Sequence, residues 1–499
     1  MEQQQTTAAS VQTEGTASEE GFAALLKKSF RPPTAERQQA IEEAVDTLSE
    51  WALRNTQLLS EDSVATIRAL IGEIDQKLTA QVNEVLHNPE FQKLENAWRG
   101  LHFLVSRSEI NDKLKVRVLP ISKLELRNTL RKFKGAAWDT SPLFKKIYEE
   151  EYGVLGGNPY GCLVGDYYFD QSATDAETLR EMSKIAAASH VPFLAAADCA
   201  IFGLQSWQEL SNPRDLTAIF STPEYAAWNS LRKSDDARYL GLTMPRFLGR
   251  MPYGAKTNPV DDFAFEEDTG GSDADKFCWL NAAYAMAANV NRAYSNYGWC
   301  TRIRGVESGG AVEDLPTYVF PTDDGGVDMA CPTEIAISDR REAELAKNGF
   351  MPLVHRKNSD VAAFIGAQSV QKPAVYDDPA ATANAELSAR LPYLFATCRF
   401  AHYLKAMVRD KIGSTFNTPE DLQAWLQNWL IGNYVHGNPG LATDEDKARK
   451  PLAAAEVIVT AQPDNPGYYH AQFLLKPHYQ LEGLTVSLRL VSKLKSDTQ

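Results

Sequence analysis

Cysteine is scarce in this sequence, and the few cysteines are scattered. The 499 residues contain 6 cysteines, and no two of them have the CxxC spacing. A disulfide framework or a cysteine-rich zinc site is therefore not predicted, and isolated reduced thiols are typical of a cytoplasmic protein. The cysteines are Cys162, Cys199, Cys278, Cys300, Cys331 and Cys398.

Long hydrophobic runs are also missing. No stretch approaches the roughly 18 consecutive apolar residues that a membrane-spanning helix needs. The first residues, Met1 to Gln5, lack the basic and apolar regions of a secretory signal peptide. We therefore expect no membrane span and a cytoplasmic location.

Positive charge is in deficit. Lys and Arg number 51 against 65 Asp and Glu, which gives a net charge of −14. A surface with this net negative charge repels the phosphate backbone of nucleic acids. The sequence also contains no cluster of basic residues that would form a local binding groove, so nucleic acid is not an expected partner. Hydrophobic residues make up 44% and charged residues 23%, which is ordinary for a globular chain with room for about three domains.

Motifs that carry chemistry are absent. The patterns GxSxG, HExxH, GxxxxGK[ST] and GxGxxG after a strand do not occur, and none of the 8 histidines forms an i, i+4 pair. We predict no catalytic residue, no cofactor and no metal. The glycines between Gly153 and Gly165 favour a tight turn before a strand over a phosphate-binding loop. One alternative stays open: a large cytosolic α/β enzyme with an acidic active site, built from Asp166, Asp170 or the acidic run at residues 261–275.

The N-terminal region changes character abruptly. Residues 1–20 are too polar to offset the entropy of ordering and should be disordered. An amphipathic helix of about ten residues follows, with Lys27 and Lys28 between its apolar positions and a stop at residues 31–33. So short a helix needs a partner surface. Its apolar residues are Phe22, Leu25, Leu26 and Phe30.

Three longer helices are predicted next. Apolar stripes run through residues 40–52 and 64–85, and a third helix begins at Asn88-Pro89, a capping residue followed by proline at the first helical position. We expect all three stripes to pack into a core. On the third helix the stripe consists of Phe91, Leu94, Trp98, Leu101 and Leu104.

The centre of the chain alternates strands and helices, which indicates a layered α/β core. Ser122 with Glu125, and Thr174 with Glu177, have the spacing of helix caps, and Ser141-Pro142 opens a further helix. The acidic run at residues 261–275 is interpreted as an exposed inserted loop. Strands are predicted at residues 114–118, 161–167, 191–197, 331–338 and 350–355, and helices at residues 279–290, 384–411 and 422–429.

The last 45 or so residues are predicted to be β structure. Runs at residues 456–460, 468–475 and 484–491 are separated by proline and glycine, and the last alternates apolar and polar side chains. From the pattern alone, these strands complete their own sheet or pair with another subunit.

Several composite strings resemble the large subunit of the type VI secretion contractile sheath, the TssC or VipB family. They are residues 88–101, beginning Asn88-Pro89-Glu90-Phe91, and residues 152–167, 237–246, 250–254 and 304–313. The resemblance covers the chain from about residue 21 to the end.

The resemblance implies a structural protein. In the family, large and small subunits (the latter TssB- or VipA-like) stack with further copies into a helical tube around an Hcp inner tube on a baseplate. Contraction propels the inner tube and spike into a target cell, and a ClpV-type AAA+ unfoldase then disassembles the sheath. Unfoldase binding would fall on Phe22, Leu25, Leu26 and Phe30. Strand pairing between subunits would involve Tyr468, Phe473, Leu475, Leu484, Val486, Leu488 and Leu490.

We therefore expect an α+β or mixed α/β fold with a sheath-like layered core. The predicted segments are a disordered tail (1–20), the short amphipathic helix (21–33), an N-terminal helical region (34–110), an α/β core with an inserted outer domain (111–380), a helical part of the core (381–453) and a C-terminal β segment for subunit pairing (454–499).

Overall fold

A computed structural model describes most of the chain between residues 63 and 478. The described residues are 63–211, 215–270, 274–317, 319–321, 327–414, 418–437, 440–462 and 468–478, with Arg37, Gln39, Glu43, Ala44 and Thr47. The predicted tail (1–20), the amphipathic helix (21–33) and the predicted strand at 484–491 lie outside them.

The chain divides into two compact units. Unit 1 is Met1–Glu84 with Tyr253–Glu267, and unit 2 is Val85–Pro252 with Asp268–Gln499. In unit 1, helix α3 (Ser63–Leu86) contacts the second segment, since Asn83 Nδ2 donates to the Glu266 carbonyl at 3.1 Å. The helix confirms the predicted 64–85 stripe, but the expected packing is wrong for much of it. Leu70 is buried, whereas Ile74, Leu78 and Val85 are exposed.

Unit 2 is built on a mixed six-stranded sheet, so the expected mixed fold is confirmed. The order is β1-β2-β3-β9-β10-β6, with β1, β2, β3 and β9 parallel and β10 antiparallel to both of its neighbours. The strands are β1 (Leu163–Phe169), β2 (Phe193–Ala197), β3 (Leu240–Met244), β9 (Phe350–His355), β10 (Ala362–Phe364) and β6 (Ala311–Val312).

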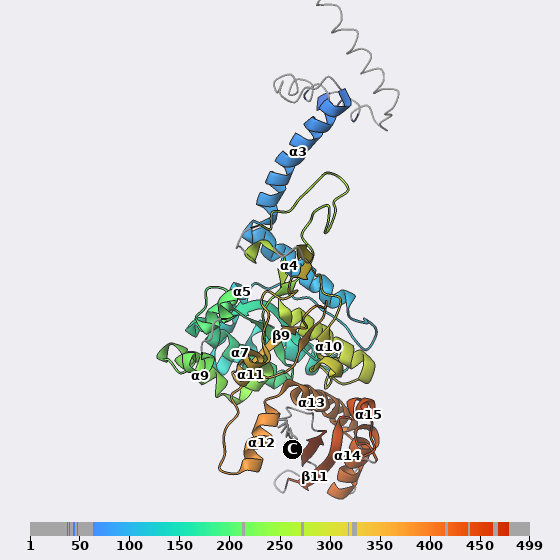
Figure 1. Ribbon diagram of the computed structural model, residues 1–499. Coiled ribbons are helices and arrows are strands. Elements are labelled where there is room, and N and C mark those ends of the chain that lie inside the picture. The colour runs from blue at the N-terminus through green and yellow to red at the C-terminus, as the bar shows by residue number, and fades with distance from the viewer. Residues whose placement is uncertain are drawn as a thin grey trace, which may run out of the picture. The chain divides into compact units, whose positions relative to one another are not determined.

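Helices cover both faces of this sheet, as Figure 1 shows for α7 and α10. Strand β2 separates two core clusters: Phe193, Ala195 and Ala197 face one cluster, and Leu194 faces the other, as side-chain alternation requires. The first cluster includes residues of α5 (Lys123–Lys132), α7 (Ala173–Ser189), α9 (Ala226–Arg232) and α11 (Asp339–Lys347). The second includes residues of α10 (Ala282–Tyr297) and α13 (Leu391–Lys411).

The C-terminal part of unit 2 packs a hairpin on a helix. Strands β11 (Leu452–Ala461) and β12 (Tyr469–Pro477) pair antiparallel beside α14 (Pro419–Tyr434), which confirms two of the predicted β runs and the helix at 422–429. Apolar residues from this hairpin, from α14 and from α13 form a third cluster around Trp299 and Phe400.

The other α-helices of unit 2 are α4 (Pro89–Ser106), α6 (Pro142–Phe144), α8 (Leu216–Ile219), α12 (Pro379–Ser388) and α15 (Asp444–Arg449). Two further pairs of short strands are β4 (Phe247–Leu248) with β5 (Trp279–Leu280), and β7 (Val319–Pro321) with β8 (Val327–Met329).

Four predictions of secondary structure are wrong. Residues 114–118 and 331–338 form no strand, because no neighbouring strand among the described residues pairs with either segment in a ladder. The cap of α7 is Ser172, whose hydroxyl accepts from the Asp175 N–H, and not Thr174. The predicted helix at 384–411 is interrupted at Arg390, which is extended because a new helix with proline in its first turn starts there.

Glycine sets the close approach of α4 to α10. A Cβ at Gly100 would lie 2.3 Å from a ring carbon of Tyr284, whereas a Cβ at Gly72 on α3 would meet nothing within 4 Å. Both glycines lie inside helices, so an alanine at either gains about 1 kcal/mol of helix propensity. Only Gly100 adds a steric cost.

We predict opposite effects for Gly100→Ala and Gly72→Ala. Overpacking against Tyr284 should lower the free energy of unfolding by about 1–3 kcal/mol in Gly100→Ala. Gly72→Ala, the matched control, should raise the free energy of unfolding by up to about 1 kcal/mol. Denaturant unfolding of both purified variants measures this, and equal stability of the two would contradict the packing account.

Candidate functional site

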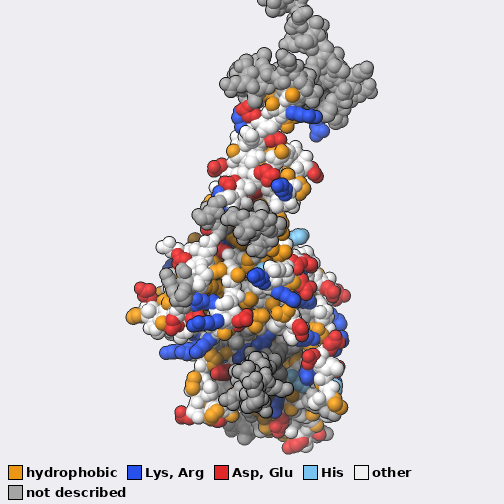
Figure 2. All heavy atoms as spheres, in the orientation of Figure 1, with side chains coloured by type: hydrophobic (Ala, Val, Ile, Leu, Met, Phe, Trp, Pro, Cys, Tyr) orange, Lys and Arg blue, Asp and Glu red, His pale blue; other side chains and the backbone are white. Residues whose placement is uncertain are grey.

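A large groove lies on unit 2 beside the β1 edge of the six-stranded sheet. Its volume is about 1710 Å³, and its walls come from α4, from the irregular segment 115–121 and from β1. On the face drawn in Figure 2, hydrophobic side chains are exposed among Lys and Arg side chains.

Helix α4 presents part of its apolar stripe, including Leu94 and Trp98, to the groove. Asn88 caps the helix as predicted, since its side-chain oxygen accepts from the Glu90 N–H at 3.0 Å. The predicted burial of the stripe holds at Leu104, which is buried, and is wrong at Leu94 and Trp98, which are 55% and 66% exposed. The helix packs on the rest of unit 2 through Gly100 and Leu104.

An ionic cluster fixes α4 to the chain that follows β4. Arg250 Nε and Arg99 Nε each donate to Glu95 Oε1 at 2.7 Å, and the side chains of Glu95 and Arg250 are at most a tenth exposed. Burial raises the pKa of Glu95, but the hydrogen bonds and charges of Arg250 and Arg99 outweigh burial, so its pKa lies below the ordinary 4.5. The cluster therefore holds a carboxylate, not a carboxylic acid.

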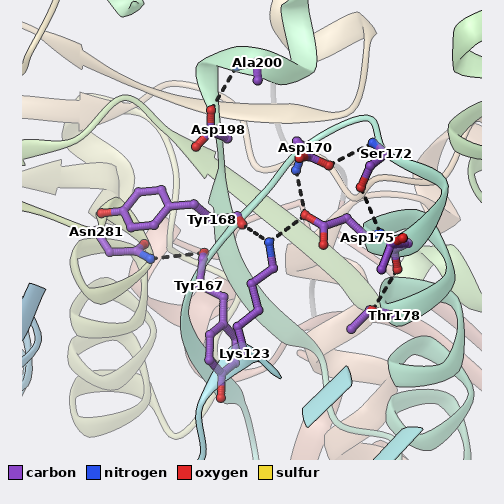
Figure 3. A network of polar contacts seen from close by, with 11 residues as sticks. Lys123, Tyr167, Tyr168, Asp170, Ser172, Asp175, Thr178, Asp198, Ala200 and Asn281 are labelled. Atoms are coloured by element: carbon purple, nitrogen blue, oxygen red, sulfur yellow. Dashed lines mark hydrogen bonds and ion pairs between the residues drawn. The ribbon is translucent and has the colours of Figure 1, made fainter. Parts of the chain in front are cut away.

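A lysine occupies the end of the open β1 edge, as Figure 3 shows. Lys123 Nζ donates to the Tyr168 carbonyl at 2.5 Å and to Asp175 Oδ2 at 2.6 Å. Asp175 Oδ2 also accepts from the Asp170 N–H at 3.0 Å. This network ties the start of α5 to the β1–α7 turn, and it satisfies one carbonyl of an edge strand that would otherwise face the groove.

The two aspartates considered for catalysis do not form a pair. Asp170 Oδ1 accepts from the Ser172 N–H at 2.8 Å; burial raises the pKa of Asp170, but the hydrogen bonds from Ser172 outweigh it and leave the pKa lowered. Burial raises the pKa of Asp166, and hydrogen bonds with Asn281 and Tyr284 offset this only in part. Four residues of extended chain separate the two by roughly 13 Å. They are not placed to share one substrate atom.

The described acidic residues of the run at 261–275 are exposed, as predicted, with one exception, Glu267. Glu267 is buried, and its Oε2 accepts from the Tyr253 N–H at 2.8 Å within unit 1. In unit 2, Asp268 binds Lys276 and Asp275 binds Arg246, at 2.7 and 2.8 Å. These carboxylates serve local structure, because each of the three has a donor of its own.

The C-terminal hairpin offers one edge for further pairing. On β11, Gln427 donates to the Ala455 carbonyl at 2.7 Å and accepts from the Val457 N–H at 2.7 Å, and Gln423 accepts from the Val459 N–H at 3.0 Å. Amide side chains of α14 thus take the place of a strand beside β11. No strand among the described residues pairs with the other edge of β12.

The predicted strand-pairing residues are only partly within the described chain. Phe473 and Leu475 lie on β12 and pack on the α14 cluster, while Tyr468 just precedes the strand and is 67% exposed. Leu484, Val486, Leu488 and Leu490, and the predicted unfoldase-binding residues Phe22, Leu25, Leu26 and Phe30, lie outside the described residues.

The sequence analysis did not predict that Trp98 lies on the surface, or that Lys123, Gln423 and Gln427 bind the edges of strands. The sequence held a clue only for Trp98. Gly100 lies on one face of α4 and large apolar residues lie on another, so the small face is the one that can approach a neighbouring helix closely. The roles of the glutamines depend on which strand lies beside α14, which the sequence does not reveal.

Within the part of the chain that the structure describes, no helix is long and apolar enough to cross a bilayer, and no cluster of three His, Cys, Asp or Glu side chains is placed to hold a metal ion.

Comparisons with known proteins point to one family. Residues 68–371 match the VipB model, described as the EvpB/VC_A0108 tail sheath N-terminal domain, and residues 380–494 match the tail sheath gpW/gp25-like domain. The chain is 66% identical over 475 residues to the type VI secretion system sheath protein TssC1 of Pseudomonas aeruginosa, covering 95% of both chains.

Solved structures with weaker likeness are also contractile machines. An anti-feeding prophage baseplate structure gives a TM-score of 0.35 at 12% identity, covering 64% of this chain and 66% of the other. The contracted sheath of an extracellular contractile injection system gives 0.31 at 9% identity, covering 62% and 68%.

The Glu95 cluster predicts an acid-dependent stability. A pKa lowered by folding stabilises the native state fully above the unfolded pKa of 4.5, and this contribution is lost as the pH falls through the lower folded pKa. Glu95→Gln should cost about 3 kcal/mol near neutral pH, because it leaves Arg250 without its carboxylate. It should also flatten the loss of stability below about pH 4.5.

Glu90→Gln is the matched control on the same helix, since Glu90 pairs with Lys93 at the surface and its side chain is 84% exposed. It should change stability by less than about 0.5 kcal/mol. Thermal unfolding at a series of pH values measures both variants, and parallel curves for wild type and Glu95→Gln would contradict the assignment.

Proposed function

Because the chain belongs to the VipB (EvpB/VC_A0108) tail sheath family, we infer that it is a structural subunit of a type VI secretion contractile sheath. The observation that carries this function is identity to a sheath protein along nearly the whole chain. Unit 2 suits such a role because a sheet edge and a hairpin edge have no strand partner among its described residues.

The assembly proposed for this chain has several partners. It co-polymerises with a small sheath subunit (TssB- or VipA-like) and with further copies of itself into a helical tube around an Hcp inner tube, on a baseplate, in the bacterial cytoplasm. Contraction drives the inner tube and spike into a target cell. The energy released resides in contacts between subunits, which rearrange as rigid bodies.

Strand exchange is the proposed link between layers. The β12 edge supports it, because α14 already occupies the β11 edge through Gln423 and Gln427. A strand of eight residues, such as 484–491, contributes about four ladder hydrogen bonds and roughly 4 kcal/mol. Such a link bends at its connecting segments while its ladder stays paired.

A ClpV-type AAA+ unfoldase is the proposed agent of disassembly. Its binding site would be the amphipathic segment with Phe22, Leu25, Leu26 and Phe30, because a short apolar helix binds in a groove of a partner. The geometry of Asp166 and Asp170 gives no support to an enzymatic function.

The proposed function is tested by assembly in vitro. The chain co-purified with the small subunit should form cog-like tubules visible in electron micrographs. A monomer that stays dispersed with the small subunit present, at concentrations where sheath proteins polymerise, would overturn it.

Deletion of residues 484–499 should abolish the tubules, because strand exchange loses its donor. The small subunit should still co-purify with the truncated chain, which serves as the folding control. Normal tubules from the truncated chain, counted in micrographs, would contradict the strand-exchange proposal.

The double change Leu25→Asp and Leu26→Asp should abolish unfoldase binding and leave tubule formation intact, because it places two charges on the apolar face of the proposed recognition helix. A pull-down with the unfoldase measures binding, with Lys27→Asp as a control on the polar face. Equal capture of the double variant and wild type would refute the assignment.

A further inference from the structure

The second half of helix α13 carries a single buried side chain. Of residues 401–411, only His402 is buried, and it is 4% exposed. Tyr403 and Leu404 lie on the other side of the helix and are half-buried against the third apolar cluster. On the side that faces α7, this half of the helix therefore depends on His402 and its polar neighbours.

His402 is bonded to the last turn of α7. Its Nε2 lies 3.0 Å from the Ser189 carbonyl oxygen. A carbonyl oxygen only accepts, so Nε2 carries the proton and Nδ1 of the neutral ring is unprotonated. Nδ1 is buried and has no hydrogen-bond partner among the described residues. A second proton on this ring would therefore create a buried charge and a buried N–H without an acceptor.

A second histidine lies beside the first. His190 follows Ser189 and ends α7 in the left-handed region, at a φ of 52°. The rings of His190 and His402 are 6.5 Å apart, and the Tyr152 ring lies 5.1 Å from that of His402. The Tyr239 hydroxyl lies 3.5 Å from His190 Nδ1. The two imidazoles thus pack among rings, and the described part of the chain gives neither of them a carboxylate partner.

The charges that act on the two imidazoles are positive. Burial lowers the pKa of His402 to about 4 against the opposing effect of its bond to Ser189, and Arg399 and Lys405 lower it further. Burial also lowers the pKa of His190, and Lys405 adds to this. The other titratable groups on the surrounding elements are Cys398 and Arg409 of α13, Tyr148 and Tyr152 of the helical segment Lys145–Tyr152, Asp236 and Tyr239 of the segment Asp235–Tyr239, and Tyr294 and Cys300, which line a small cavity with His402.

We propose that His402, with His190 beside it, makes the attachment of α13 to α7 sensitive to acid: both rings are neutral while this contact is closed, and proton uptake opens it. The contact joins the two segments that separate family models match, residues 68–371 and 380–494. Mild acid therefore loosens the second half of α13 from the first of these segments.

The direction of the pH dependence follows from where the proton binds. In the open contact the pKa of His402 returns toward 6.5, whereas the closed contact takes up the proton only near pH 4. The closed contact thus keeps its full stability above pH 6.5 and loses it as the pH falls toward 4. Between pH 7.5 and 5.0, one titrating histidine should raise the ratio of open to closed contact about 30-fold.

Hydrogen exchange of the full chain tests this, with each rate corrected for the intrinsic rate at its pH. In wild type, protection of the amides in residues 402–411 should fall by about 30-fold or more between pH 7.5 and 5.0. His402→Gln should make this fall at least about tenfold smaller, because the glutamine amide can still donate to the Ser189 carbonyl but does not titrate. His102→Gln, the matched control at an exposed histidine of α4, should behave as wild type. Glu95 does not contribute, since its pKa below 4.5 leaves it ionised at pH 5.0.

His190→Asn is a second variant, because asparagine tolerates the left-handed conformation at the end of a helix. It should give a fall between those of wild type and His402→Gln, since it removes one of the two titrating rings. The quantity compared is the ratio of protection at the two pH values, so a variant that is less stable at both still tests the proposal.

Three outcomes would overturn the proposal. Equal protection of residues 402–411 at both pH values in wild type would show that the contact does not respond to acid. An equal fall in wild type and His402→Gln would assign the response to another group. An equal fall at the β2 amides, residues 193–197, would mean unfolding of the sheet and not opening at α13.

Discussion

An edge strand carries peptide groups that need partners, and unit 2 meets this constraint in different ways at its edges. At β11, Gln423 and Gln427 supply the donors and acceptors of an absent strand. At the end of β1, Lys123 occupies a single carbonyl. The rest of the β1 edge and the outer edge of β12 have no strand partner among the described residues. An unpaired strand edge of this kind is able to pair with a strand of another chain.

Helix α4, beside the β1 edge, is held in place by specific contacts. Gly100 lets α4 lie directly on the Tyr284 ring of α10, and the buried Glu95 carboxylate of α4 pairs with Arg99 of the same helix and with Arg250, which follows β4. Because these contacts fix the position of α4, its exposed Leu94 and Trp98 are presented without an ordering cost. Preorganised apolar anchors of this kind raise affinity by lowering the entropy lost on binding.

Features with local chemistry were predicted from the sequence, and features that depend on neighbours were not. The caps at Asn88 and Ser122 were predicted correctly because each bonds an amide two or three residues away. The strand at 114–118 was wrong because alternation shows a capacity to pair but not the presence of a partner. The stripe on α4 was assigned to the core for a similar reason: periodicity identifies an apolar face, and a face that binds another subunit has the same pattern as one that is buried. The family resemblance supplied the function that the absent motifs could not.

The central claim is that this chain is a structural subunit whose unpaired strand edges bind other chains. A cryo-EM reconstruction of tubules formed with the small subunit tests it most directly. The account predicts main-chain density from another subunit continuing the hairpin sheet beyond β12. A map in which that edge faces solvent, with subunits joined only through other surfaces, would contradict it.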